Sequence, residues 1–155
     1  MAKQTPLEML TEIQEGKVDE ALNLVAICQQ TLNQAIEQRD MLYQYRIDYE
    51  KQFREEAKKG IKPTHLHNYH AFLSKLDHAI EQQEQIVVQL EAQLEKRKEE
   101  WVEEKNKLKA YETLLERKEK EKQAKENRQE QKMSDEHGAK KYRERLQREQ
   151  EGKQD

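Results

Sequence analysis

The chain has 155 residues, of which 39% are charged and only 34% apolar, too little apolar surface for an ordinary globular core of this length. Its 29 basic and 32 acidic residues leave a net charge of −3, which argues against a nucleic acid or an anionic membrane as partner. Four glycines and two prolines interrupt a composition rich in helix formers, so we expect a few long helices with a narrow buried stripe.

The cysteine content and the N-terminal sequence indicate the cellular compartment that we expect for the protein. Cys28 is the single cysteine, which excludes an intramolecular disulfide and suits a reducing compartment. No apolar segment typical of a signal peptide follows Met1, and no run approaches the ~18 apolar residues of a membrane span. We therefore expect a soluble, cytoplasmic protein.

The first expected helix covers about residues 6–58. Thr5 can cap it, Pro6 suits the first helical position, and Glu8 completes a capping box. From residue 18 onward a mostly apolar stripe follows the three-and-four spacing of a heptad seam. Its members are Val18, Ala21, Val25, Cys28, Leu32, Ala35, Arg39, Leu42, Arg46, Tyr49 and Phe53. Leu10 and Ile13 lie outside this frame, which predicts a stutter or bend at Gly16.

A turn is expected at about residues 59–63. Gly60 can adopt a left-handed C-cap, and Pro63 precedes the expected cap of the next helix, Thr64. The second helix then covers about residues 64–136, and its stripe is again mostly apolar. That stripe consists of Leu66, Tyr69, Leu73, Leu76, Ile80, Gln83, Val87, Leu90, Leu94, Arg97, Trp101, Glu104, Leu108, Tyr111 and Leu115.

The sequence beyond Leu115 is almost entirely charged or polar, so a helix there has nothing to bury. Gly138 is expected to end this helix, leaving residues 138–155 as a polar tail that is poorly ordered or forms a short helix.

A short link between two heptad helices predicts an antiparallel hairpin. If the turn centres near Gly60, facing residues have numbers that add to about 121. Leu115 then lies opposite Pro6, so the second helix loses its apolar stripe where the first runs out of residues to face it. The expected fold class is therefore all-α, with two long helices in one antiparallel coiled-coil hairpin over residues 1–137.

Six of the nine aromatic residues lie around the turn: Tyr43, Tyr45, Tyr49, Phe53, Tyr69 and Phe72. A narrow two-helix seam cannot bury them all. The flanking (g) heptad positions of Tyr45, Phe72 and Ala79 share one edge of an antiparallel pair, which predicts an exposed aromatic strip for partner binding. The alternative, that these residues only widen the core, stays open.

Catalytic and metal chemistry find little support. His67 and His70 can share a helix face, but no well-placed third ligand joins them. A two-helix rod offers no dry pocket to perturb its many carboxylates, and no phosphate-binding loop occurs. We expect no enzyme activity, no metal and no cofactor. The polar residues of the seam, Arg39, Arg46, Gln83, Arg97 and Glu104, are interpreted as register-setting.

Several stretches, in this order and spacing, resemble the FliJ family of flagellar type III export proteins over about residues 7–137. They are Met41-Leu42 with Tyr45 and Tyr49, Asn68 to Phe72, Leu76 to Gln82, Trp101 to Lys105 with Leu108, Glu126 to Arg128, and Gln131 to Met133. The length, the turn position and the region of Val18 and Asp19 are also similar.

The resemblance implies a coiled-coil stalk like that of rotary ATPases, located in the cytoplasm and peripherally at the inner membrane. Its free helix ends would enter the hexameric ring of the export ATPase FliI; the residues assigned to this are Leu10, Ile13, Arg117, Asn127 and Arg128. The export gate protein FlhA would bind Gln38, Leu42, Tyr45, Tyr49, Phe72, Leu76 and Ala79. Relatives can have His where this chain has Gln83. Family members also handle export chaperones.

Other functions remain open. A stalk of a virulence-type secretion system would share this fold. A structural coiled-coil tether would self-associate, whereas we expect a monomer. RNA binding by the charged end of the chain is the least favoured hypothesis because the net charge is near zero.

Overall fold

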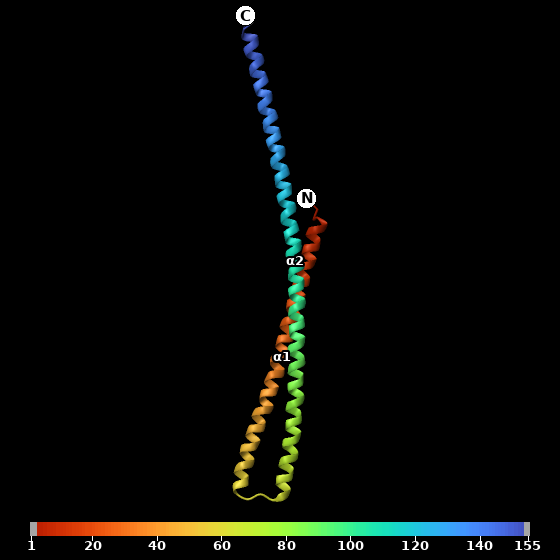
Figure 1. The fold of residues 1–155 in the computed structure, drawn as a ribbon, viewed down its shortest axis with the longest axis vertical. Helices are drawn as coiled ribbons and strands as arrows, with labels where there is room; N and C mark the ends of the chain where they lie inside the picture. Colours follow the sequence, from red (N-terminus) through yellow and green to blue (C-terminus); the bar gives the residue numbers. More distant parts are fainter. Residues whose placement is uncertain (1–2, 154–155) are drawn as a thin grey trace. The chain divides into compact units, whose positions relative to one another are not determined.

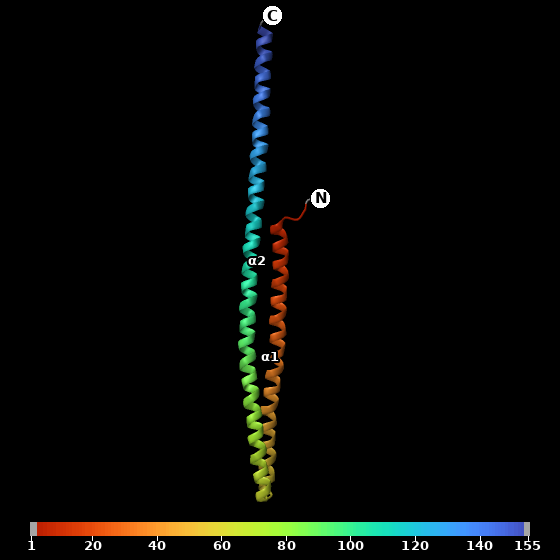
Figure 2. The same cartoon turned by 90° about the vertical axis from the view of Figure 1, so that its right-hand side faces the viewer.

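The computed structural model describes residues 3–153, and within them it contains two helices and no strand. Helix α1 spans Pro6–Lys58 and helix α2 spans Pro63–Lys153. The chain divides into two units, one covering Glu12–Leu108 and the other combining the residues up to Thr11 with those from Lys109 onward. Both views of the ribbon show α1 and α2 running in opposite directions, as the sequence predicts (Figures 1 and 2).

The seam of the Glu12–Leu108 unit follows the facing rule. Gln38 meets Gln83 and Tyr49 meets Phe72, and in both pairs the residue numbers add to 121. The buried core cluster consists of Leu32, Ala35, Val87 and Leu94, with Val25, Cys28, Ile36 and Leu90 packed against it. Burying a side chain of this size contributes about 1.5–3 kcal/mol, so stability comes from many small layers and not from one compact core.

The beginning of α1 corrects one expectation. Thr11 and Gln14 are buried, at 7% and 3% exposure, whereas Leu10 and Ile13 are 47% and 56% exposed. The buried stripe therefore keeps its heptad frame past Gly16, and the predicted stutter is wrong. The polar atoms tolerate burial because they are bonded: the Gln14 amide donates to the Glu104 carbonyl at 2.9 Å, and Thr11 Oγ1 donates to the Leu7 carbonyl at 2.8 Å.

The ends of α1 follow their local sequence. The Glu8 N–H donates to Thr5 Oγ1 at 3.2 Å and the Thr5 N–H donates to the Glu8 carboxylate at 3.1 Å, which confirms the capping box. At the other end Gly60 takes φ +94°, a left-handed conformation that favours glycine, and its N–H donates to the Ala57 carbonyl.

Helix α2 differs from expectation at both ends. It begins at Pro63 itself, because a proline at the first helical position needs no N–H partner. It also continues through Gly138 to Lys153, so the predicted end near residue 136 is wrong. Gly138 has no positive φ, and the strong helix formers around it outweigh its cost of about 1 kcal/mol. No residue from 116 to 153 is buried.

Candidate partner-binding surface

Stacked rings join the two helices next to the turn. Phe53 of α1 stacks on Tyr69 of α2 with centroids 3.6 Å apart, and Tyr49 lies 5.3 Å from Tyr69. Tyr49 also packs against Phe72 at 4.6 Å, and Phe72 meets the edge of Tyr45 at 6.0 Å. The outermost ring is therefore held by a chain of aromatic contacts, of which the three that involve Tyr49 or Phe72 have centroid separations typical of favourable aromatic pairs.

Burial is unequal across this cluster. Tyr69 is only 9% exposed, and loss of water around its hydroxyl raises the pKa of Tyr69. Tyr49 and Phe53 are half-buried. Tyr45 and Phe72 are 53% and 36% exposed. Both sequence-level interpretations thus describe part of the cluster: the inner rings widen the core and the outer rings face solvent.

We call the seven residues assigned to the gate the aromatic strip: Gln38, Leu42, Tyr45, Tyr49, Phe72, Leu76 and Ala79. The structure brings them to one edge but does not expose them equally. Leu42, Tyr49 and Ala79 are half-buried, and Leu76 is 7% exposed. Leu76 therefore lies in the seam beneath the strip, where it supports the other residues instead of presenting a side chain.

A shallow hollow of about 380 Å³ lies on this edge and is lined by Gln38, Met41, Leu42, Tyr45 and Gln83. Met41 was not among the residues predicted for the site, yet it is 71% exposed. Its signal in the sequence is its heptad position, which is next to the g positions on the outer side of the same edge. An apolar side chain from a partner can sit against Met41 and Tyr45 in this hollow.

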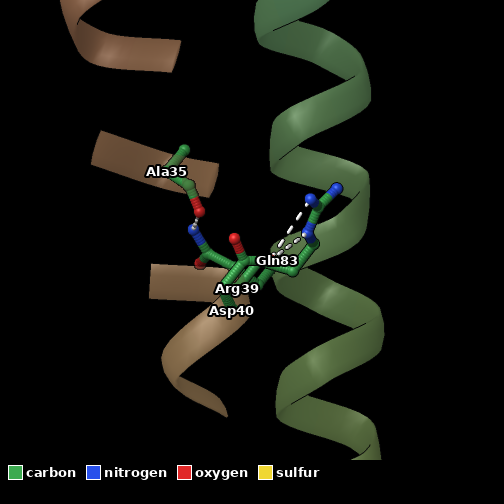
Figure 3. A network of polar contacts seen from close by, with 4 residues as sticks. All are labelled: Ala35, Arg39, Asp40 and Gln83. Atoms are coloured by element: carbon green, nitrogen blue, oxygen red, sulfur yellow. Dashed lines mark hydrogen bonds and ion pairs between the residues drawn. The ribbon is translucent and has the colours of Figure 1, made fainter. Parts of the chain in front are cut away.

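Gln83, which lines the hollow, joins α2 to α1 at Ala35, as Figure 3 shows. Its amide donates to the Ala35 carbonyl at 3.0 Å and to the Gln38 side-chain oxygen at 3.3 Å. In the same view Arg39 pairs with Asp40 at 3.3 Å. Gln83 therefore positions Gln38, a residue of the aromatic strip, while filling a seam position itself.

The other edge of the seam near the turn carries an ion-pair network. Arg46 Nε donates to Asp77 across the seam at 2.6 Å, and its Nη1 donates to Glu50 at 2.9 Å. The hydrogen bond to Asp77 is the largest cause that raises the pKa of Arg46. Like the contact of Gln14 with Glu104, this pair joins α1 to α2 at one register, which agrees with a register-setting role.

The residues assigned to the ATPase ring are all exposed. Leu10 and Ile13 lie on the outer face of α1, and Arg117, Asn127 and Arg128 lie on the polar part of α2. Among residues 3–153, no group of three His, Cys, Asp or Glu side chains is arranged to hold a metal ion. Within the same residues, no helix is long and apolar enough to cross a membrane.

Comparison with known proteins identifies the relatives of this chain. The family model of the flagellar FliJ protein matches residues 3–147. The flagellar FliJ proteins of Salmonella typhi and Escherichia coli K12 are each 32% identical over 136 residues, which covers 88% of this chain and 92% of each relative. The chain belongs to the flagellar FliJ family. Membership of this family supports a role in flagellar protein export.

A solved structure shares the fold. A putative YscO homologue from Chlamydia trachomatis superposes with a TM-score of 0.54 at 22% identity, covering 94% of this chain and 99% of that one. The likeness supports two long helices as the fold of the chain.

Proposed function

We propose that this protein is a cytoplasmic stalk of the flagellar export apparatus that works by binding two partners at different places along its helices. The aromatic strip near the turn binds the export gate, an FlhA-like protein. The start of α1 and the charged end of α2 bind the ring of the export ATPase, an FliI-like hexamer. The protein would thereby associate with the inner membrane peripherally, and it would also handle export chaperones.

The observation that carries the gate assignment is the exposure of Tyr45 above a stacked cluster. Large aromatic rings that stay in water without a partner are the residues that dominate protein interfaces when they are covered. Tyr45 is 53% exposed and is fixed by Phe72 and Tyr49, so binding orders few side chains. Rigid anchors of this kind are favourable for affinity because their conformational entropy is already lost.

The ring assignment is supported by the character of α2 beyond Leu115. This stretch is helical to Lys153 and has no buried residue, and its basic and acidic side chains are mixed. A hydrated surface of mixed charge can adapt to a ring in which each subunit contacts a different part of the same stalk. The exposed Leu10 and Ile13 supply apolar contacts at the start of α1.

Replacing Tyr45 tests the gate assignment. We expect Tyr45→Ala to weaken binding to the cytoplasmic region of the gate protein about tenfold or more, measured by isothermal titration calorimetry. Tyr43→Ala is the matched control, because Tyr43 is also an exposed tyrosine of α1 but lies at the opposite edge of the seam. Equal affinities of the two variants would refute the aromatic strip as the gate site.

Truncation after Leu115 tests the ring assignment. We expect the truncated protein to keep the helicity of residues 12–108 but to lose stimulation of the export ATPase, measured as phosphate release. A second truncation after His137 serves as a control, because it keeps Arg117, Asn127 and Arg128. Full stimulation by the shorter protein would show that the polar part of α2 does not contact the ring.

A further inference from the structure

The two flanks of α2 differ sharply in charge beside the seam. At four successive heptads the flank on the side of the aromatic strip is uncharged, and the opposite flank is charged at every heptad. The uncharged positions are Phe72, Ala79, Ile86 and Gln93, and the charged ones are Asp77, Glu84, Glu91 and Lys98. In a chain with 39% charged residues, this separation gives the hairpin one neutral and one charged edge along α2.

Helix α1 contributes a matching uncharged stripe. Its seven successive outer positions on the same edge carry no charge; they are Leu24, Ile27, Thr31, Gln34, Gln38, Met41 and Tyr45. The stripes of α1 and α2 share this edge, because Tyr45 of α1 meets Phe72 of α2 with ring centroids 6.0 Å apart and both stripes follow the heptad positions of these two residues. The stripe of α1 is roughly 30 Å long at 1.5 Å per residue.

The part of this edge beyond the aromatic strip has no role in the proposed function. We call it the neutral edge; it consists of Leu24, Ile27, Thr31 and Gln34 of α1 with Ile86 and Gln93 of α2. Its apolar members face solvent, since Leu24, Ile27 and Ile86 are 40%, 51% and 44% exposed. Directly beneath it lies the buried cluster around Leu32 and Val87, so the hairpin does not need these side chains for its own core.

Charged side chains of α1 and α2 lie at both ends of the uncharged stretch. One end is marked by Glu20 of α1 and Lys96 of α2, and the other end by Asp48 of α1 and Lys75 of α2. All four side chains are exposed and occupy the outermost heptad position of this edge. At this outermost position the border formed by α1 is acidic at both ends and the border formed by α2 is basic at both ends, while the next flanking positions beyond Leu24 and Gln93 carry Lys17 and Glu100.

We propose that the neutral edge, continuing from the aromatic strip, binds an amphipathic α-helix of a partner protein as a third strand of the coiled coil. That helix presents about three heptads of uncharged, mostly apolar residues to the edge. It carries basic residues on its flank toward α1 and acidic residues on its flank toward α2. The length of the uncharged stretch sets the length of the partner helix, and the heptad spacing requires that the partner be helical. The border charges set the direction in which the partner helix runs.

Designed peptides test this proposal on the full-length protein. The matched peptide is a fluorescent helix of about 21 residues with Leu and Ile on its apolar face, Lys on one flank and Glu on the other. Two control peptides share the apolar face but carry Glu on both flanks or Lys on both flanks. By fluorescence anisotropy at low ionic strength, we expect the matched peptide to bind about tenfold more tightly than either control.

Two protein variants test whether the matched peptide binds at the neutral edge. Ile27→Glu places a charge in the neutral edge, and we expect it to weaken binding of the matched peptide about tenfold or more. Leu22→Glu is the matched control, since Leu22 is 45% exposed on α1 at the opposite edge, and we expect its affinity to equal that of the unmodified protein. Circular dichroism establishes that both variants keep their helicity.

Three results would overturn the proposal: no binding of the matched peptide, equal binding of all three peptides, or equal binding by the two variants. A dimer in sedimentation velocity that only Ile27→Glu dissociates would also overturn it, because the occupant would then be a second copy of this chain. The test is independent of the gate assignment, since Ile27 lies outside the aromatic strip and its variant can be checked for unchanged gate binding.

Discussion

Polar side chains that find partners in the seam are the residue-scale feature that sets this hairpin apart from an all-apolar coiled coil. Gln14, which is 3% exposed, bonds Glu104, and Gln83 bonds the Ala35 carbonyl. An apolar residue at either seam position would bury more surface and would fit many registers equally well. The polar pairs give up some stability and in return hold α1 and α2 at one register, which the aromatic strip needs because it draws residues from both helices.

Tyr69 yields a prediction on pH. Desolvation by burial raises the pKa of Tyr69 in the folded chain. The neutral hydroxyl therefore contributes stability that is fully present below the unfolded pKa of about 10. This contribution is lost as the pH rises through the folded pKa. We expect the urea midpoint of the protein to fall more steeply above pH 10 than that of Tyr69→Phe.

The comparison with Tyr69→Phe isolates this effect, because the other tyrosines and the lysines titrate in both proteins. Below pH 9 the difference between the two midpoints should stay constant. Parallel curves across the whole pH range would contradict a raised pKa of Tyr69 in the folded chain.

At the scale of elements, the glycines show that sequence context decides what a helix breaker does. Gly16 and Gly138 lie inside helices with no positive φ, whereas Gly60 ends α1 at φ +94°. Helix formers flank the first two on both sides, while Pro63 follows Gly60 three residues later and cannot continue α1. A single glycine thus ends a helix here only where proline supports the break.

Alanine substitution at two glycines should have opposite effects. Gly16→Ala should raise the free energy of unfolding by about 0.5–1 kcal/mol, because open space surrounds the added methyl and alanine favours the helix. Gly60→Ala should lower it by about 1 kcal/mol, because a left-handed alanine is strained. Urea denaturation followed by circular dichroism measures both, and a shift of the same sign in both would contradict the backbone assignment.

On the scale of the whole molecule, burial is concentrated in one part of the chain. The core cluster and the polar pairs between α1 and α2 lie within Glu12–Leu108, whereas residues 116–153 form a helix with no buried side chain. A helix without packing depends on its own propensity and on side-chain pairs that contribute only a few tenths of a kcal/mol each. Such a region suits contacts that form only when a partner is present.

Limited trypsin digestion should reveal this difference. Lysines and arginines occur throughout both regions, so cleavage reports local opening and not the availability of sites. We expect the first cuts between residues 117 and 148 and a persistent fragment that retains residues 12–108, identified by mass spectrometry. Early cuts at Lys51 or Lys75 would contradict the stable hairpin.

The amino-acid sequence predicts the two helices, their antiparallel pairing and the capping box, because heptad spacing and turn chemistry are local properties that the neighbours of a residue already define. It also grouped Tyr45, Phe72 and Ala79 on one edge, since flank positions follow from the same period. The family resemblance, carried by short stretches in a fixed order, agrees with the FliJ relatives that the comparisons found.

Which residues of that pattern are buried depends on how α1 packs against α2. Apolar character alone suggested a shifted frame at Leu10 and Ile13, but Gln14 takes the seam because Glu104 on the other helix accepts its hydrogen bond. The burial of Leu76 beneath the aromatic strip and the exposure of Met41 likewise depend on what α1 and α2 place opposite each other. A local pattern cannot supply these facts, because the satisfaction of a polar group depends on a residue ninety positions away.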